Sequence, residues 1–224
     1  MNYRLHVSPS LLAADYGYLA DAAIQAEKSG AGSIHVDYMD GHYVPNLSFG
    51  IDLIPALKKR VSIPLIAHLM ISNAEERIDD FIKVKPHYVV VQEDAVNDLG
   101  GILDKIKGAG IKCGIAINPD RKLEVIKKYL QEIDYLLILS VFPGFGGQKF
   151  IPETLKKMKE AHELRISQNL GYDIAVDGGV NLNTAPEIVK AGANVLIAGT
   201  AIYGAENIGE VIKKFLSLET LQIG

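Results

Sequence analysis

The sequence predicts an α/β protein, a (β/α)8 or TIM barrel that residues 1–224 form as one domain. Apolar runs of strand length alternate with amphipathic segments of helix length, without a linker or low-complexity stretch between them. The length of 224 residues suits a single barrel. Polar side chains suited to catalysis or metal binding fall late in several strands, where barrel enzymes carry their active sites.

The apolar runs predict eight strands. Most runs are nearly continuous and rich in β-branched residues, as expected for parallel strands that are buried on both faces. In chain order the strands cover residues 5–10, 33–39, 64–70, 87–92, 112–118, 134–141, 172–178 and 194–199.

The amphipathic segments between these strands predict the helices. They cover residues 19–29, 51–60, 74–84, 99–108, 123–132, 152–168, 184–191 and 208–218. Asn73 and Asn183 are predicted N-caps, and Gly30, Gly110 and Gly192 are predicted to end helices. An open doubly wound sheet is the rival fold. The eight regular units and the lack of a Gly-x-Gly-x-x-Gly turn after the first strand count against it.

A metal site is predicted from histidines and aspartates on three strands. Because side chains alternate along a strand, His35 and Asp37 share one face of their strand. His68 and Asp177 fall late in two further apolar strands. Burying these four groups is costly unless something binds them, so they predict one catalytic divalent metal. The mixed nitrogen and oxygen ligands suit zinc, iron(II), manganese or cobalt.

Glycine turns in the last third of the chain predict a phosphate site. They follow the sixth, seventh and eighth strands, where barrels often hold a phosphate. Glycines let backbone N–H groups approach an anion closely, and a threonine hydroxyl adds a donor. The predicted phosphate-binding residues are Gly146, Gly147, Gly178, Gly179, Gly199 and Thr200.

Composition excludes several other classes of protein. The net charge of −4, without a lysine-arginine cluster, gives no sign of a nucleic-acid partner. The single cysteine, Cys113, excludes an internal disulfide, and its apolar surroundings predict a buried, inert thiol. No secretory signal and no apolar run of membrane-spanning length is present, so we expect a soluble cytoplasmic protein without a membrane partner.

Several sequence blocks in order resemble the ribulose-phosphate 3-epimerase family, over nearly the whole chain. The blocks are SPSLLAAD at 8–15, HVDYMDGH at 35–42, VPN at 44–46, HLM at 68–70, PGFGGQKF at 143–150, VDGGV at 176–180 and AGTAI at 198–202. The resemblance implies a barrel of the ribulose-phosphate-binding type that interconverts D-ribulose 5-phosphate and D-xylulose 5-phosphate in the pentose phosphate pathway. It also implies a small-molecule ketose phosphate as substrate and a homo-oligomer.

The resemblance further implies roles for the predicted site residues. In that family two histidines and two aspartates hold a divalent metal, and they map onto His35, Asp37, His68 and Asp177. The two aspartates also act as acid and base at C3, on opposite faces of the sugar, through an enediolate. Met39 and Met70 are expected to wall the site, although ordinary core packing explains them equally well. Ser10 is expected to hydrogen-bond the substrate or the metal environment.

The chain departs from the family pattern at four positions. Gln92 stands where histidine is frequent, Ala175 where glutamate is frequent, Leu139 where methionine is frequent and Phe142 where a polar residue is usual. These departures leave two alternatives open: a 3-epimerase of a hexulose phosphate such as D-allulose 6-phosphate, and a non-catalytic sugar-phosphate-binding barrel. Related decarboxylase barrels use an Asp-x-Lys-x-x-Asp strand end, which is absent here.

Overall fold

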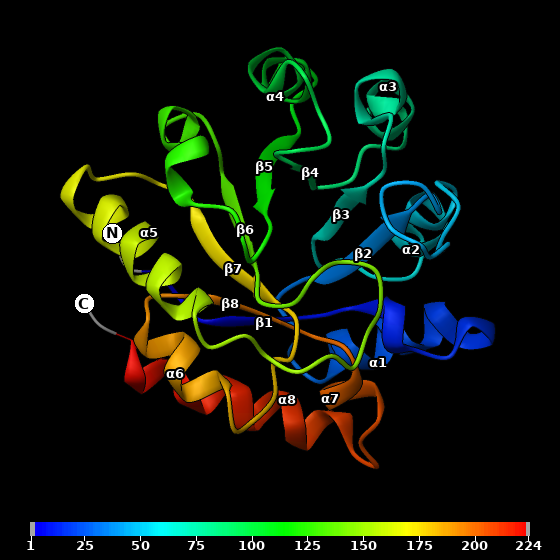
Figure 1. Ribbon diagram of the computed structural model, residues 1–224. Helices are drawn as coiled ribbons and strands as arrows, with labels where there is room; N and C mark the ends of the chain where they lie inside the picture. Colours follow the sequence, from blue (N-terminus) through cyan, green and yellow to red (C-terminus); the bar gives the residue numbers. More distant parts are fainter. Residues whose placement is uncertain (1–2, 223–224) are drawn as a thin grey trace.

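Parallel strands form the barrel that the sequence predicts. The computed structural model describes residues 3–222, so the first and last two residues of the predicted domain lie outside the described residues. Eight strands form one sheet in the order β1-β8-β7-β6-β5-β4-β3-β2, and every ladder between neighbours is parallel. A bridge between Ser10 and His35 closes the seam between the first two strands, which excludes the open-sheet alternative (Figure 1). The strands are β1 (His6–Pro9), β2 (Ile34–Met39), β3 (Leu65–Met70), β4 (Tyr88–Gln92), β5 (Lys112–Ile117), β6 (Tyr135–Leu139), β7 (Asp173–Asp177) and β8 (Val195–Ala198).

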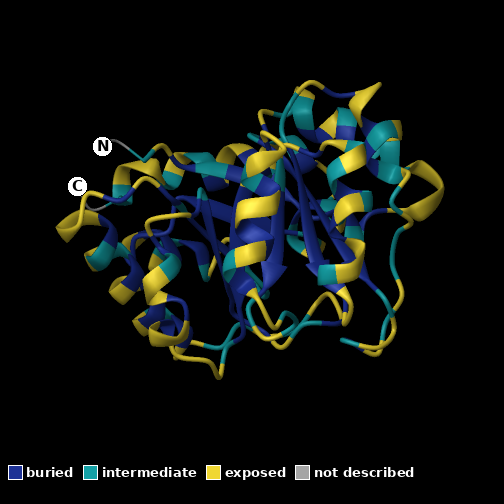
Figure 2. Ribbon diagram, turned by 90° about the horizontal axis from the view of Figure 1, so that it is seen from above, coloured by how far each residue is buried: buried dark blue, intermediate teal, exposed yellow. Residues whose placement is uncertain are grey.

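Helices surround the strands, and Figure 2, coloured by burial, shows that their exposed residues face outward, away from the buried strands. The α-helices are α1 (Leu19–Lys28), α2 (Leu53–Lys58), α3 (Ala74–Val84), α4 (Leu99–Gly108), α5 (Thr154–Ser167), α6 (Ala185–Lys190), α7 (Thr200–Tyr203) and α8 (Ile208–Leu216). Five 3-10 turns complete the described elements: η1 (Leu11–Ala13), η2 (Tyr16–Tyr18), η3 (Leu123–Val125), η4 (Lys127–Tyr129) and η5 (Ser217–Leu221). Within residues 3–222, no helix has the length and apolar character needed to cross a bilayer.

The alternation of side chains along each strand divides the core in two. Val36 and Tyr38 belong to the larger cluster, which packs the outside of the barrel against the helices. Val90, Leu137 and Ala175 belong to a smaller cluster inside the barrel. The inward faces therefore carry apolar side chains beneath the residues that the sequence predicts as the site.

Three local predictions need correction. The helix expected at 123–132 is wrong, because this segment forms the two 3-10 turns η3 and η4. Leu123, Ile126 and Leu130 are buried, and this spacing fits an α-helix as well as 3-10 turns, so it does not decide the local structure. Asn183 does not cap α6, whose N-cap is Thr184, since the side chain of Asn181 accepts the N–H of Asn183 and shapes the preceding turn. The short helix α7 was not expected.

The predicted helix-ending glycines are confirmed. Gly30, Gly110 and Gly192 have φ angles of 94°, 73° and 99°, and each follows the last residue of its helix cap. Asn73 is the N-cap residue of α3, as predicted, although its side chain makes no capping hydrogen bond. The positive φ angles of the three glycines reverse the chain at low steric cost and return it to the next strand.

Candidate active site

A cavity of about 330 Å³ opens at the carboxyl ends of the strands. The loop between β6 and α5 crosses this end of the barrel in Figure 1. All the residues predicted to touch substrate or phosphate line the cavity: Ser10, Met39, Met70, Gly146, Gly147, Gly178, Gly179, Gly199 and Thr200. Asp37 and Asp177 also line it and are the charged residues of its described lining, so the cavity is acidic at its base.

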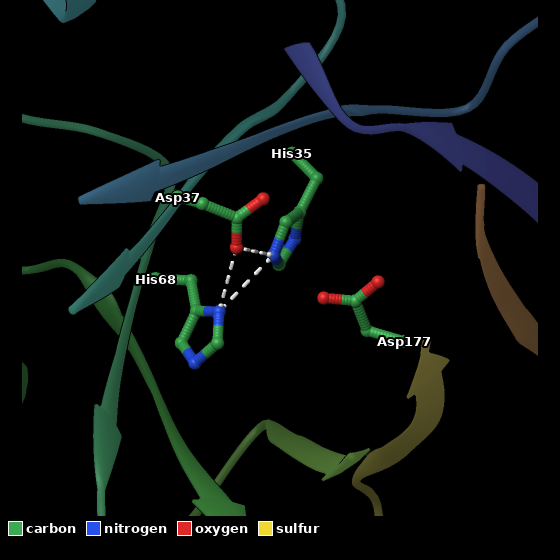
Figure 3. A group of neighbouring side chains, drawn as sticks. All are labelled: His35, Asp37, His68 and Asp177. Atoms are coloured by element: carbon green, nitrogen blue, oxygen red, sulfur yellow. Dashed lines mark hydrogen bonds and ion pairs between the residues drawn. The ribbon is translucent and has the colours of Figure 1, made fainter. Parts of the chain in front are cut away.

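Four residues from three strands, His35, Asp37, His68 and Asp177, come together at the base and are called here the His–Asp cluster. Their candidate ligand atoms all lie within 4.8 Å of one another. Figure 3 shows Asp177 on β7 facing the other three side chains, which come from β2 and β3. Asp37 Oδ1 lies 3.0 Å from His35 Nε2 and 2.9 Å from His68 Nδ1. The two ring nitrogens are 3.3 Å apart.

The pKa values of the two carboxyl groups of the cluster are shifted in opposite directions. Burial disfavours ionisation of Asp37, but the adjacent imidazoles of His35 and His68 outweigh it and hold the pKa of Asp37 far below its usual value. Burial, together with the negative charge of Asp37, raises the pKa of Asp177 to about 7. The two carboxyl groups therefore differ in their neighbours: imidazoles lie beside Asp37, and a carboxylate lies near Asp177.

The pKa values of the two imidazoles are also shifted in opposite directions. Burial opposes a positive charge on His35, but the carboxylate of Asp37 outweighs it and raises the pKa of His35. Burial lowers the pKa of His68, because Asp37 compensates only in part there.

The donor atoms of the cluster fit a divalent transition-metal ion. They combine two imidazole nitrogens and two carboxylates, a set that zinc, iron(II), manganese and cobalt accept. Ligands about 2.0–2.1 Å from a tetrahedral metal are separated by roughly 3.3 Å. The separations of 2.9, 3.0 and 3.3 Å among three of the donor atoms approach that value. His35 Nδ1 and Gln92 Oε1 are buried polar atoms near this set that have no hydrogen-bond partner among the described residues.

Hydroxyl groups around the cluster fix the two aspartates. Ser10 donates a hydrogen bond of 2.7 Å to Asp37 Oδ2, so its predicted contact is with the cluster. Ser48 donates to the backbone carbonyl of Asp37 and accepts from the N–H of Met39. Ser140 donates to the carbonyls of Asp177 and Gly178, at 2.9 and 2.6 Å. Sequence reasoning missed Ser48 and Ser140, because their roles depend on contacts between segments distant in the chain.

Two methionines form part of the apolar wall of the cavity. Met39 and Met70 are paired across β2 and β3, are nearly fully buried, and form a small apolar cluster with Val44. Ala175 and Leu139, two of the positions that depart from the family pattern, lie in the apolar interior of the barrel. At these two positions the site therefore has aliphatic side chains in place of polar or thioether groups.

The predicted phosphate residues converge from three loops, and together they are called the glycine cradle: Gly146, Gly147, Gly178, Gly179, Gly199 and Thr200. A Cβ added at Gly147 would lie 3.9 Å from Thr200 Oγ1, so the loops after β6 and β8 approach each other closely. The cradle offers backbone N–H groups and a hydroxyl rather than a lysine or arginine side chain.

Gly179→Ala is expected to lower the free energy of unfolding by roughly 1–3 kcal/mol. The φ angle of Gly179 is 64°, and a Cβ there would overlap the backbone nitrogen of Phe150. Chemical denaturation measures the change. Gly171→Ala is the matched control, because a Cβ at Gly171 meets nothing within 4 Å. Equal stability of the two variants would contradict the close packing of Gly179 against the backbone of Phe150.

Asp40 ties the loop after β2 to the loop after β3. Its carboxylate accepts from the N–H groups of His42 and Tyr43 and from both the N–H and the hydroxyl of Ser72. These hydrogen bonds outweigh partial burial and lower the pKa of Asp40 to about 2. This agrees with a role in orienting the loop.

The Asp40 tether is expected to persist in moderate acid. A carboxyl group with a lowered pKa contributes stability above its unfolded value of about 3.9, and loses it as the pH falls through the folded value. The amide resonance of Ser72 should therefore show no inflection near pH 4 and begin to shift only toward pH 2. If the Ser72 resonance has an inflection near pH 4 that disappears in Asp40→Asn, the lowered pKa of Asp40 is contradicted.

A family model and several curated relatives match nearly the whole chain. A model of the Ribulose-phosphate 3 epimerase family matches residues 6–203. The ribulose-phosphate 3-epimerase of Bacillus subtilis is 39% identical over 94% of this chain and 97% of that protein. That of Methanocaldococcus jannaschii is 37% identical over 93% of this chain and 88% of that protein. The orotidine 5'-phosphate decarboxylase structure from Pyrococcus horikoshii has a TM-score of 0.69 at 18% identity, covers 96% of this chain and 99% of that one, and shares the fold alone.

Proposed function

This chain belongs to the ribulose-phosphate 3-epimerase family and is an epimerase, and we propose that it interconverts D-ribulose 5-phosphate and D-xylulose 5-phosphate. Epimerisation beside a ketone requires removal of the C3 proton on one face and delivery of a proton to the other. Two carboxyl groups on opposite sides of the substrate can perform the two transfers. The observation that carries the proposal is the pair of buried carboxyl groups, Asp37 and Asp177, which line one cavity and lie close together at its base.

Asp37 and Asp177 exchange roles with the direction of the reaction. The carboxylate that takes the C3 proton becomes the acid for the reverse reaction, while the other carboxyl group supplies its proton to the opposite face. Ser10 holds one oxygen of Asp37, and Ser140 holds the backbone at Asp177. These contacts support fixed positions for both carboxyl groups on either side of the substrate.

His35, Asp37, His68 and Asp177 are the residues that would hold one divalent metal ion. When bound, such an ion supplies electrophilic stabilisation of the negative charge that develops on the substrate oxygens. The histidines are fully buried, and Met39 and Met70 present apolar side chains at the adjacent wall. The low polarity of this wall strengthens the electrostatic interactions at the base.

The glycine cradle would bind the phosphate group of the substrate. Its backbone N–H groups and the Thr200 hydroxyl are donors suited to an anion. The phosphate end and the acid–base pair line the same cavity, so one extended sugar phosphate can reach both.

The proposed substrate is tested by incubating metal-loaded protein with D-ribulose 5-phosphate, and separately with D-allulose 6-phosphate, and following C3 by NMR. We expect the 3-epimer to form faster from the pentulose phosphate. Faster turnover of the hexulose phosphate would assign the chain to the six-carbon branch. No turnover of either compound, by protein shown to hold metal, would favour the sugar-phosphate-binding alternative.

A further inference from the structure

Gln92 is buried in the barrel beside the His–Asp cluster. It is the last residue of β4, it is fully buried, and its side-chain nitrogen Nε2 lies 2.9 Å from His68 Nε2. Its side-chain oxygen Oε1 is buried and has no hydrogen-bond partner among the described residues. A buried amide oxygen without a partner costs about 1–3 kcal/mol, so its presence at this position calls for a compensating role.

The two nitrogens of His68 have different neighbours. Nδ1 faces Asp37 Oδ1 and His35 Nε2 inside the cluster, while Nε2 faces Gln92. An imidazole nitrogen that binds a cation must offer its lone pair, so the other nitrogen of the neutral ring carries the proton. If Nδ1 is the ligand atom, Nε2 is therefore an N–H donor and needs an acceptor.

The Gln92 amide can form a hydrogen bond with His68 whether the proton of the ring is on Nδ1 or on Nε2. With Nε2 of Gln92 toward the ring, the amide donates to a bare His68 Nε2, and Nδ1–H of His68 donates to Asp37. A half-turn of the amide exchanges its nitrogen and oxygen and brings Oε1 to the same ring atom. Oε1 then accepts the Nε2–H of the ligand form of His68, while the amide nitrogen moves to the position that the oxygen has left.

We propose that Gln92 is a positioning residue that fixes the cation-binding tautomer of His68, by accepting the Nε2–H of His68 through Oε1. This inference rests on the proposed role of the His–Asp cluster as a metal site. Hydrogen-bond acceptors behind ligand histidines change metal affinity by about 10- to 100-fold when they are removed. Because an amide both donates and accepts, Gln92 can support the ring with and without the cation.

The test compares variants of the full chain that differ in the group facing His68. Gln92→Met keeps the approximate length of the side chain but supplies no strong acceptor, whereas Gln92→Glu supplies a carboxylate acceptor. Competition with a chelating indicator at one fixed pH measures the affinity of each protein for Zn²⁺. We expect Gln92→Met to bind Zn²⁺ about 10- to 100-fold more weakly, and Gln92→Glu to restore the affinity. Tyr135→Phe, which removes another buried and unpartnered polar atom of the barrel interior, should leave the affinity unchanged.

A second measurement needs no variant. In Zn²⁺-loaded wild-type protein with ¹⁵N-labelled histidine, the ¹⁵N shifts of His68 should report a protonated Nε2 and a metal-bound Nδ1. A bare Nε2 in the loaded protein, or wild-type affinity in Gln92→Met, would overturn the role of Gln92 while leaving the metal site intact. Failure of the wild-type cluster to bind Zn²⁺, Mn²⁺, Fe²⁺ or Co²⁺ would overturn both this inference and the metal site on which it rests.

Discussion

Replacing Asp177 by asparagine is expected to lower kcat for 3-epimerisation by about 10²- to 10⁴-fold, the usual contribution of a positioned acid or base. The amide has nearly the shape of the carboxyl group, but it cannot take up or deliver a proton. In the proposed mechanism, the buried carboxyl group of Asp177 acts on the face of the sugar opposite to Asp37. Steady-state assays in both directions measure the loss.

The control for this variant lies on the same strand. Asp173→Asn makes the same change at the opposite end of β7, where Asp173 accepts a hydrogen bond from Asn194. Its kcat should stay close to the wild-type value. Metal content is measured in both variants, because Asp177 is also a proposed ligand. An Asp177→Asn protein that binds metal and turns over at the wild-type rate would exclude the two-carboxylate mechanism.

Removal of the divalent cation is expected to abolish turnover and to lower the thermal stability of the protein. The buried His–Asp cluster brings two carboxylates and two imidazoles within 4.8 Å of one another, an arrangement that a cation compensates. A cation present at about a hundredfold excess over its dissociation constant stabilises the folded state by roughly 2.7 kcal/mol. Dialysis against a chelator, followed by addition of single metals, tests both effects by activity assay and thermal unfolding.

Histidine variants distinguish metal bound at the His–Asp cluster from metal bound nonspecifically at the surface. His68→Asn should prevent recovery of activity and of thermal stability when metal is added back. His42→Asn should recover fully, because His42 is an exposed loop residue outside the cluster. Full activity in the chelated wild-type protein would contradict a catalytic metal.

The fold was predictable from the sequence because parallel barrel strands have a strong local signal. Continuous β-branched runs and punctuating glycines such as Gly30 located the strands and the helix ends to within a few residues. The segment 123–132 was harder, because burial of Leu123 and Ile126 fits either an α-helix or a 3-10 turn. The local sequence does not separate these alternatives, and packing against the barrel decides between them.

The approach of the four cluster residues was predictable from strand alternation and from the rule that barrel sites lie at the carboxyl ends of strands. The residues that support them were not. Ser140 acts on the backbone of Asp177 from the neighbouring strand region, and Gln92 meets His68 across the pairing of β3 and β4. Such contacts depend on the register between strands, which the sequence of one strand does not contain.

The most direct test of the proposed mechanism is the fate of the C3 hydrogen in the first turnover in D2O. Metal-loaded protein is mixed with excess D-ribulose 5-phosphate, and NMR follows deuterium at C3 of the product and of the remaining substrate. A mechanism in which Asp37 and Asp177 act on opposite faces of the sugar predicts that the first D-xylulose 5-phosphate formed carries solvent deuterium at C3. The remaining substrate is then still unlabelled. Early product that retains the original C3 hydrogen would show return of the proton by a single group and would contradict the mechanism.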